Sequence, residues 1–361
     1  MQTALIHYWL TNMRGGESVL LELCKLFPQA DIFTHACLAD NIDPEFSTHQ
    51  IRESFIAQLP GGRRHCQKYL PLMFKALQKF DLSNYDLIIS SESGPAKAVN
   101  KRSGAAHICY CHTPMRYLYD MYDEYYQHAP LPGKAAMKLF TPALRKLDRA
   151  SADKVDHFIA NSRFVAQRIQ RVWQREAVVI HPPVDTAYFA QASNTGTGDY
   201  YLFAGELTAY KHPELALEAC KHMNRKLIVA GGGNLEQKLR KRYSCDNITF
   251  TGRCSRERLR SLYAGARALI FPNIEDFGIV PLEAQSTGTP VIALQGGGAL
   301  ETVQNNVTGI YFPAMQASSL CAAIEELESR TFYAGIIRRH AAAFDRTVFR
   351  DKISNFLQQV L

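Results

Sequence analysis

Residues 268–283, which read ALIFPNIEDFGIVPLE, place a short apolar run, a polar loop and the start of a helix in direct succession. A buried strand followed by a helix is the repeating unit of a parallel sheet. The first turn of the helix, at residues 278–280, presents unpaired backbone N–H groups, which attract an anion. Glu275 and Glu283 flank these groups, eight positions apart. Because carboxylates accept hydrogen bonds from hydroxyl groups, the pattern indicates a ligand with hydroxyls on both sides of a diphosphate.

The same two acids have a purely structural interpretation. Acidic side chains near a helix N-terminus stabilise the helix dipole by about 0.3–1 kcal/mol each. The spacing of Glu275 and Glu283 alone leaves both interpretations open.

Short apolar runs alternate with helical stretches along the whole chain. In the first half the runs are 4–8, 85–90, 106–110 and 157–160, with helices from 15 to about 27 and from about 163. A further run at 178–180 precedes Pro182-Pro183, and in the second half the runs are 201–204, 227–230, 248–250, 268–271 and 291–293, with helices at 213–222 and 256–264. Continuous apolar runs separated by helices are typical of parallel sheets covered on both faces. We therefore predict an α/β fold of two Rossmann-like, doubly wound parallel-sheet domains facing a central cleft, where ligands bind at the carboxyl ends of the strands.

The length of 361 residues favours two domains. Pro182-Pro183 cannot continue a strand, and the low-complexity loop 191–198 soon afterwards is the best linker candidate. We predict domains at residues 1–182 and 183–345, followed by a C-terminal helix at 346–361 that packs back toward the first domain.

The composition, with 47% hydrophobic and 21% charged residues, excludes a disordered or fibrous protein. No apolar run approaches the roughly 18 residues that span a bilayer, and the first ten residues lack the features of a secretory signal. The nine scattered cysteines include no Cys-x-x-Cys pair, which suits a reducing cytosol. We expect a cytoplasmic protein.

Two stretches concentrate positive charge among apolar residues. Residues 52–79 contain six Lys or Arg against Glu53, and residues 134–149 contain five against Asp148. Basic amphipathic surface attracts anionic lipid headgroups, at about 1 kcal/mol per cation near a membrane. An ordinary solvated helix face would show the same charge pattern.

Several motifs together resemble the retaining glycosyltransferases of family 4, which have the GT-B fold. Besides Glu-x7-Glu with Phe-Gly-Ile-Val inside, the matching stretches, in the family order, are ICYCHTPMRY at 108–117, ANSRFV at 160–165, HPPVD at 181–185 and GTPVIA at 288–293. The resemblance covers nearly the whole chain and is closest to mannosyltransferases that build bacterial O-antigens and capsular polysaccharides from GDP-mannose. It implies an acceptor-binding first domain, a nucleotide-sugar-binding second domain, a lipid-linked saccharide acceptor and peripheral association with the inner face of the cell membrane, and it implies no nucleic-acid partner.

The resemblance also implies roles for individual residues. Lys211 would lie against the diphosphate, Glu275 would hold hydroxyls of the sugar, and His112 would face the sugar from the acceptor side. The remaining donor-binding residues would be Gly15 and Gly16 in the first loop, Phe277, Gly278, Ile279 and Val280 at the helix start, and Glu283 at the ribose. A lone histidine such as His112 is otherwise more often a structural residue.

One position departs from the family pattern. Where the family commonly has Gly-Arg-Leu, with the arginine on the diphosphate, this chain has Gly205-Glu206-Leu207. Either nearby positive groups neutralise Glu206 or its side chain turns away. The departure motivates an alternative function, a non-catalytic relative that binds a nucleotide-sugar or assembles with active transferases. A further alternative keeps the fold and changes the reaction, as in nucleotide-sugar epimerases or phosphorylases that carry pyridoxal phosphate.

The sequence contains neither Asp-x-Asp nor a His/Cys cluster with metal-ligand spacing. We therefore expect no metal and no cofactor, with the nucleotide-sugar, predicted to be GDP-mannose, acting as substrate.

Overall fold

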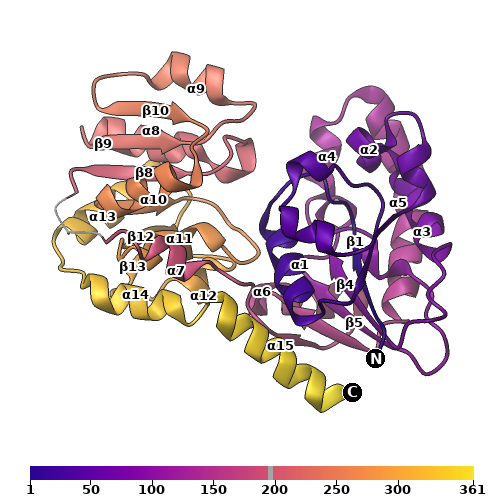
Figure 1. Ribbon diagram of the computed structural model, residues 1–361. Coiled ribbons are helices and arrows are strands. Elements are labelled where there is room, and N and C mark those ends of the chain that lie inside the picture. The colour runs from indigo at the N-terminus through magenta and orange to yellow at the C-terminus, as the bar shows by residue number, and fades with distance from the viewer. Residues whose placement is uncertain (194–197) are drawn as a thin grey trace. The chain divides into compact units, whose positions relative to one another are not determined.

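The computed structural model describes residues 1–193 and 198–361 and divides them into two compact units (Figure 1). The first unit comprises Met1–Pro182 with Arg350–Leu361, and the second comprises Pro183–Phe349. Residues 194–197, within the loop predicted as a linker, lie outside the described residues.

The first unit is built on a seven-stranded parallel sheet with the order β3-β2-β1-β4-β5-β6-β7. Its strands are β1 (Thr3–His7), β2 (Asp31–Thr34), β3 (Ile51–Glu53), β4 (Leu87–Glu92), β5 (Ala106–Cys111), β6 (His157–Ala160) and β7 (Ala177–Val179). Its helices are α1 (Gly15–Leu26), α2 (Gly62–His65), α3 (Leu70–Gln78), α4 (Tyr122–His128), α5 (Leu131–Ala152), α6 (Arg163–Trp173) and most of α15 (Arg346–Val360).

Alternating side chains of these strands enter two different cores. Ala4 and Ile6 of β1 and Ile88 of β4 share one face with Phe74 of α3 and Leu144 of α5. Helix α1 contacts β1 and β4 from the other face (Figure 1). The sheet is therefore covered on both sides, which explains why its strands are apolar runs without alternation.

The second unit is built on a six-stranded parallel sheet with the order β10-β9-β8-β11-β12-β13. Its strands are β8 (Tyr200–Ala204), β9 (Lys226–Ala230), β10 (Ile248–Gly252), β11 (Ala268–Phe271), β12 (Val291–Leu294) and β13 (Gly309–Phe312). Its helices are α7 (Thr186–Phe189), α8 (Pro213–His222), α9 (Glu236–Tyr243), α10 (Arg256–Gly265), α11 (Ile279–Ser286), α12 (Ala299–Thr302), α13 (Ala317–Glu328) and α14 (Ala334–Ala342).

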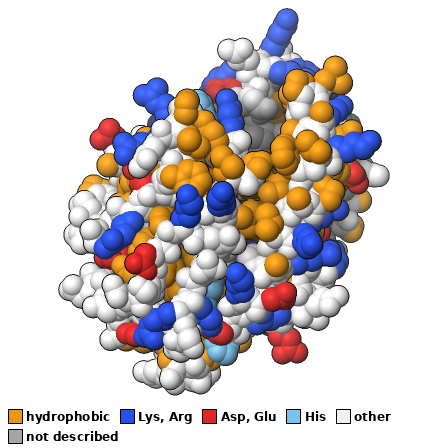
Figure 2. Space-filling model, turned by 90° about the vertical axis from the view of Figure 1, so that its right-hand side faces the viewer, with side chains coloured by type: hydrophobic (Ala, Val, Ile, Leu, Met, Phe, Trp, Pro, Cys, Tyr) orange, Lys and Arg blue, Asp and Glu red, His pale blue; other side chains and the backbone are white. Residues whose placement is uncertain are grey.

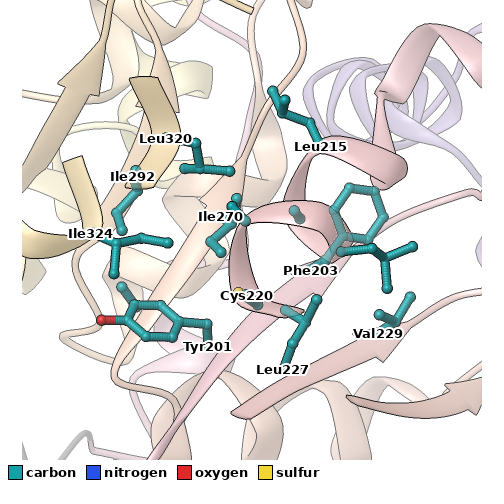
Figure 3. Packing of buried hydrophobic residues seen from close by; sticks show 14 of the residues in the cluster. Tyr201, Phe203, Leu215, Cys220, Leu227, Val229, Ile270, Ile292, Leu320 and Ile324 are labelled. Atoms are coloured by element: carbon teal, nitrogen blue, oxygen red, sulfur yellow. The ribbon is translucent and has the colours of Figure 1, made fainter. Parts of the chain in front are cut away.

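The two faces of this sheet also carry separate cores. Tyr201, Phe203 and Ile270 pack with α8 and α13, among the residues labelled in Figure 3. Their neighbours along the same strands, Leu202 and Leu269, pack on the opposite face with α7, α10, α11 and α12. The predicted fold class, two Rossmann-like parallel-sheet domains, is confirmed. The sequence analysis missed β2, β3 and β13.

A buried charge cluster connects β4 with α5 in the first unit. The ammonium group of Lys97, which is fully buried, pairs with Glu92 at the end of β4 and with Asp148 of α5. Asp148 also accepts hydrogen bonds from Tyr119 and Trp173, both 2.7 Å long. Burial lowers the pKa of Lys97, but the two carboxylates outweigh it and raise this pKa above its usual range. The cation is therefore a permanent part of the core.

Replacing this cation tests its contribution to stability. In Lys97→Met, two buried carboxylates lose their counter-ion, so we expect the free energy of unfolding to fall by about 3–5 kcal/mol. Denaturant titration measures it. The matched control is Lys101→Met, which removes a partly exposed pair with Asp156 and should cost about 0–1 kcal/mol. Equal losses of unfolding free energy in the two variants would contradict the role of Lys97 as the counter-ion of two buried carboxylates.

Candidate functional site

The strand order of the second sheet reverses between β8 and β11, and the predicted site residues follow these two strands. Lys211 lies in the short turn after β8, and Glu275 lies in the loop after β11. Their side chains form an ion pair, with 2.9 Å between Lys211 Nζ and Glu275 Oε1. Asn273 Nδ2 donates to the same oxygen, also at 2.9 Å. A point where the strand order reverses is where doubly wound sheets bind ligands.

Lys211 keeps its positive charge in this environment. Burial lowers its pKa, but Glu275 and other neighbouring groups outweigh burial, so the pKa is raised. The side chain of Lys211 lies over Gly205. A Cβ added at Gly205 would stand 3.5 Å from Lys211 Cδ and Nζ. Gly205 has a φ of +151°, which disfavours other residues, so the backbone geometry also supports a glycine here.

Glu206, the departure from the family pattern, is exposed to solvent. Its charge contributes to the raised pKa of Lys211. Glu206 is thus both exposed to solvent and electrostatically coupled to Lys211.

A glycine turn supports the loop between Glu275 and α11. Gly298 N–H donates to the carbonyl of Glu275 at 2.8 Å. A Cβ at Gly298 would stand 2.2 Å from the carbonyl oxygen of Phe277, so no side chain fits there. Gly278, the N-cap of α11, has a φ of +95° and turns the backbone into the helix. This geometry sets the N–H groups at the start of α11 beside the loop that carries Glu275.

The predicted residues at the start of α11 differ in exposure. The Phe277 side chain is only 3% exposed and packs with Val184, Leu282 and Phe344. Ile279 and Val280 are half-buried, and Gly278 is buried. Phe277 therefore anchors the loop, and its side chain is not a surface for a ligand.

Glu283, in the second turn of α11, has an unusual acidity. Its carboxylate accepts a hydrogen bond of 3.0 Å from the hydroxyl of Tyr263. Burial raises the pKa of Glu283 to about 7, although Tyr263, Arg256 and Lys211 oppose this shift. A ligand that donates hydrogen bonds to the carboxylate would favour its ionised form.

In the first unit, the predicted residues follow β1, where the strand order reverses, and β5, which neighbours β4. Gly15 and Gly16 open α1 directly after the β1 loop. A Cβ at Gly16 would stand 2.5 Å from the hydroxyl oxygen of Tyr8 and 3.5 Å from His112 Nε2. The lack of a side chain at Gly16 therefore leaves room for the Tyr8 hydroxyl, and His112 lies beside Gly16 at the α1 N-terminus.

A series of contacts between polar side chains positions His112. His112 Nε2 lies 2.8 Å from Ser91 Oγ, and Ser91 Oγ lies 3.1 Å from His7 Nδ1. The other ring nitrogen of His7 lies 3.7 Å from the buried carboxylate of Glu17. Burial, with a contribution from His7, lowers the pKa of His112 to about 3. His112 is therefore a neutral imidazole at physiological pH, able to donate one hydrogen bond and accept another.

Sequence reasoning found Lys211, Glu275 and Glu283 but missed the residues that orient them. Asn273 and Tyr263 bind the two carboxylates directly. Arg256 bonds Asp185 at 2.5 Å, with its guanidinium 4.3 Å from the ring centre of Tyr188. Asn273 lies within the stretch quoted first and could have been noticed there, whereas the other contacts join residues far apart in sequence.

Within residues 1–193 and 198–361, no group of three or more His, Cys, Asp or Glu side chains is arranged to hold a metal ion. In the same residues, no helix combines the length and apolar character that crossing a membrane requires.

Comparisons with known proteins identify related sequences over both units. The family model described as Glycosyltransferase Family 4 matches residues 13–188, and the one described as Glycosyl transferases group 1 matches residues 185–342. The D-inositol 3-phosphate glycosyltransferase of Mycobacteroides abscessus is 28% identical over 59% of this chain and 54% of its own length. The O-antigen chain mannosyltransferase C of Escherichia coli is 28% identical over 54% of this chain and 56% of its own length. The chain thus spans about half the length of these curated relatives.

A third relative shares more identity over a shorter segment. The GDP-mannose-dependent alpha-(1-6)-phosphatidylinositol monomannoside mannosyltransferase of Mycobacterium tuberculosis is 37% identical over 28% of this chain and 29% of its own.

Solved structures resemble the whole chain. HepE of Anabaena, solved with UDP, has a TM-score of 0.71 at 16% identity and covers 99% of this chain and 100% of its own. The lipopolysaccharide outer core galactosyltransferase WaaB has a TM-score of 0.72 at 16% identity, with full coverage of both chains. At this identity the likeness shows the shared GT-B fold.

The acidity of Glu283 predicts a pH-dependent stability. Because its pKa of about 7 in the folded chain exceeds the ordinary 4.5, folding favours the protonated form. The contribution of this carboxyl group to the free energy of unfolding is therefore fully present below about pH 4.5 and is lost as the pH rises through 7. Relative to wild type, Glu283→Gln should gain about 2 kcal/mol in free energy of unfolding between pH 5 and pH 8.

Denaturant titrations at both pH values measure this gain. The control is Glu218→Gln, because Glu218 also accepts a bond from a tyrosine hydroxyl, that of Tyr243 at 2.7 Å, but is largely exposed. A gain with pH in this control as large as that in Glu283→Gln would show that loss of a tyrosine-bonded carboxylate, and not burial, is the cause. A Glu283→Gln difference that is constant with pH would show that the carboxyl has ordinary acidity.

Proposed function

The chain belongs to the family 4 glycosyltransferases, and we propose that it transfers a hexose from a nucleotide-sugar to a hydroxyl of a lipid-linked saccharide, with retention of configuration. The donor that we propose is GDP-mannose, and the process is the synthesis of a bacterial surface polysaccharide. The observation that carries the proposal is the Lys211–Glu275 pair beside the N-terminus of α11, where the sheet order reverses.

The choice of mannose rests on relatives. Two of them are described as mannosyltransferases, one acting on an O-antigen chain and one being GDP-mannose-dependent. Among the solved structures of similar fold, HepE was captured with UDP-glucose, which supports a nucleotide-sugar as the class of donor. These structures share only 16% identity with the chain, so the mannosyltransferases carry more weight for the sugar.

In the proposed reaction the bond between the sugar and the diphosphate breaks first. Negative charge then grows on the leaving phosphate, and Lys211 with the N–H groups at Gly278 and Ile279 would stabilise it. These fixed positive groups supply the charge that a metal ion supplies elsewhere, which is why we propose a metal-independent reaction.

Two carboxylates would hold the ends of the donor. We propose that Glu283 accepts the ribose hydroxyls and that Glu275 accepts hydroxyls of the sugar, while neutral His112 donates to the sugar from the first unit. Glu275 shares one oxygen with Lys211 and Asn273, which makes it a poor nucleophile and a well-oriented acceptor. The acceptor hydroxyl would attack the face that the phosphate leaves, and a phosphate oxygen would take its proton.

Removing the cation tests this mechanism. In Lys211→Gln the leaving phosphate loses its charged partner, so we expect kcat to fall by about 10²–10³-fold at saturating donor. Transfer to a soluble acceptor analogue measures it. The control is Lys226→Gln, because Lys226 is 64% exposed at the opposite end of the sheet and should keep its rate.

Wild-type turnover by Lys211→Gln would refute the mechanism. Thermal-shift measurements with GDP-mannose, UDP-glucose and ADP-glucose separate the alternatives, since a donor at about 100 times its Kd stabilises the fold by about 2.7 kcal/mol. Stabilisation by one donor without turnover on any acceptor would favour the non-catalytic relative.

We also propose that the protein acts at the inner face of the cytoplasmic membrane, attached peripherally through the basic surface of its first unit. Lys138, Lys146 and Arg149 of α5 are exposed, and the only acid of that helix, Asp148, is buried with Lys97. Exposed cations near anionic headgroups contribute about 1 kcal/mol each at low ionic strength.

Flotation with vesicles measures this attachment. We expect binding to phosphatidylglycerol-containing vesicles to fall about tenfold or more in Lys138→Gln/Lys146→Gln, because two of these contributions are lost. A control with two exposed lysines of the second unit replaced, Lys226→Gln/Lys238→Gln, should bind like wild type. No binding by the wild type at low salt would contradict membrane attachment.

A further inference from the structure

An apolar hollow opens on the first unit between α3, α4 and α5. Its volume is about 280 Å³, and it lies among residues 68–71, 117–125 and 136–144. Leu118 and Leu144 are buried at its base, whereas Tyr125 and Phe140 are exposed by 48% and 41%. Of the described residues that line it, Lys68 and Thr141 alone are neither aliphatic nor aromatic. The hollow therefore suits an apolar group and offers few partners to a sugar or a nucleotide.

The hollow continues into a wider apolar surface. Leu72 of α3 and three leucines of α5, Leu131, Leu139 and Leu147, are all exposed. Figure 2 shows hydrophobic side chains gathered on the face that carries α3 and α5, with Lys and Arg side chains among them. An exposed apolar area of this kind marks an interaction surface.

Positive charge borders this surface. Lys68 lines the hollow itself, and Lys75, Lys138 and Lys146 are exposed nearby on α3 and α5. Within the described part of the chain, none of these four lysines has a carboxylate at ion-pair distance. Asp123 and Glu124 are exposed on α4, whereas Asp148, two positions after Lys146, is buried with Lys97. The charge pattern thus fits an occupant with an apolar chain and an anionic head.

A second copy of this chain fits the same surface poorly. In a symmetric dimer the same patch faces itself, so the unpaired lysines of α3 and α5 would oppose each other. An anionic lipid has no such cost, because its phosphate complements the lysines.

The hollow is held open by contacts within the unit. Arg145 Nε of α5 donates to the carbonyl of Leu118 at 2.5 Å, and its guanidinium lies 5.2 Å from the ring centre of Tyr122 on α4. Asp148, one turn further along α5, is tied to buried Lys97. These contacts fix α5 relative to α4 and to the sheet, so that the hollow exists without a ligand.

We propose that this hollow binds one hydrocarbon chain of an anionic membrane lipid while Lys68 and the lysines of α5 bind the lipid's phosphate. Attachment then has a component that salt does not remove, because the apolar side chains that line the hollow leave water when the hydrocarbon chain covers them. The inference rests on the proposed function for its membrane setting alone, since lipid binding can be measured without any sugar transfer.

Matched substitutions on α5 test the proposal. Phe140 lines the hollow, whereas its neighbour Leu139 does not line it and is more exposed, at 72%. We measure flotation with phosphatidylglycerol/phosphatidylcholine vesicles at 50 mM and 500 mM NaCl. The variant Leu139→Glu should bind the vesicles about fivefold more weakly than wild type, because it adds one negative charge. Phe140→Glu should weaken it about tenfold further and abolish the binding that persists at 500 mM NaCl.

The proposal would be overturned if Leu139→Glu lost as much vesicle binding as Phe140→Glu, or more. That result would indicate that the whole apolar face inserts into the membrane according to exposure, without a role for the hollow. Thermal melting and transfer to a soluble acceptor analogue check that Phe140→Glu is folded. If no variant transfers sugar, the proposed function fails while the flotation result is unaffected.

A labelling experiment locates the chain directly. The probe is a single-chain alkyl phosphate with a diazirine at the end of the chain, used below its micelle concentration. After irradiation, mass spectrometry should find the label on Met137, Phe140 or Tyr125. Label spread over Leu131, Leu139 and Leu147, or absent altogether, would exclude a chain-binding hollow and leave surface adsorption or a protein partner.

Discussion

The constraint on which both candidate sites depend is the single reversal of strand order in each parallel sheet. In a parallel sheet all strands end at one edge, and a reversal makes the loops after two adjacent strands diverge. The reversal between β8 and β11 places Lys211 against Glu275. In the first unit, Gly16 follows β1 at the reversal, and His112 follows β5, the strand beside β4. The chemistry of each site thus follows from topology before any individual side chain is considered.

The second-unit site is preorganised by pairing its own charges. Lys211 is held by Glu275, which is held in turn by Asn273, and Glu283 is held by Tyr263. Preorganised charge stabilises a transition state without reorganisation during the reaction. Glu206 is exposed, and the positive charge beside Glu275 comes from Lys211.

Helix α5 connects the interior of the first unit with its surface. Its inner side contributes Asp148 to the buried cluster around Lys97, and its outer side carries the leucines and lysines around the apolar hollow. Because a buried ion pair is costly to break, the helix is held in one position. A rigid helix with an apolar hollow can select a single lipid chain, whereas a loose amphipathic helix would only adsorb to a surface.

The sequence by itself determined the α/β class, most strands and the stretch from Phe271 to Glu283, because buried parallel strands and helix starts leave local patterns. It also identified Glu275 and Glu283 as candidates through their spacing around a helix start, and Lys211 through family resemblance. Only the tertiary structure decided that Asn273 and Tyr263 orient these acids, that Ser91 and His7 support His112, and that α3, α4 and α5 enclose an apolar hollow. These features join residues distant in sequence, and no local period or propensity records which strands and helices become neighbours.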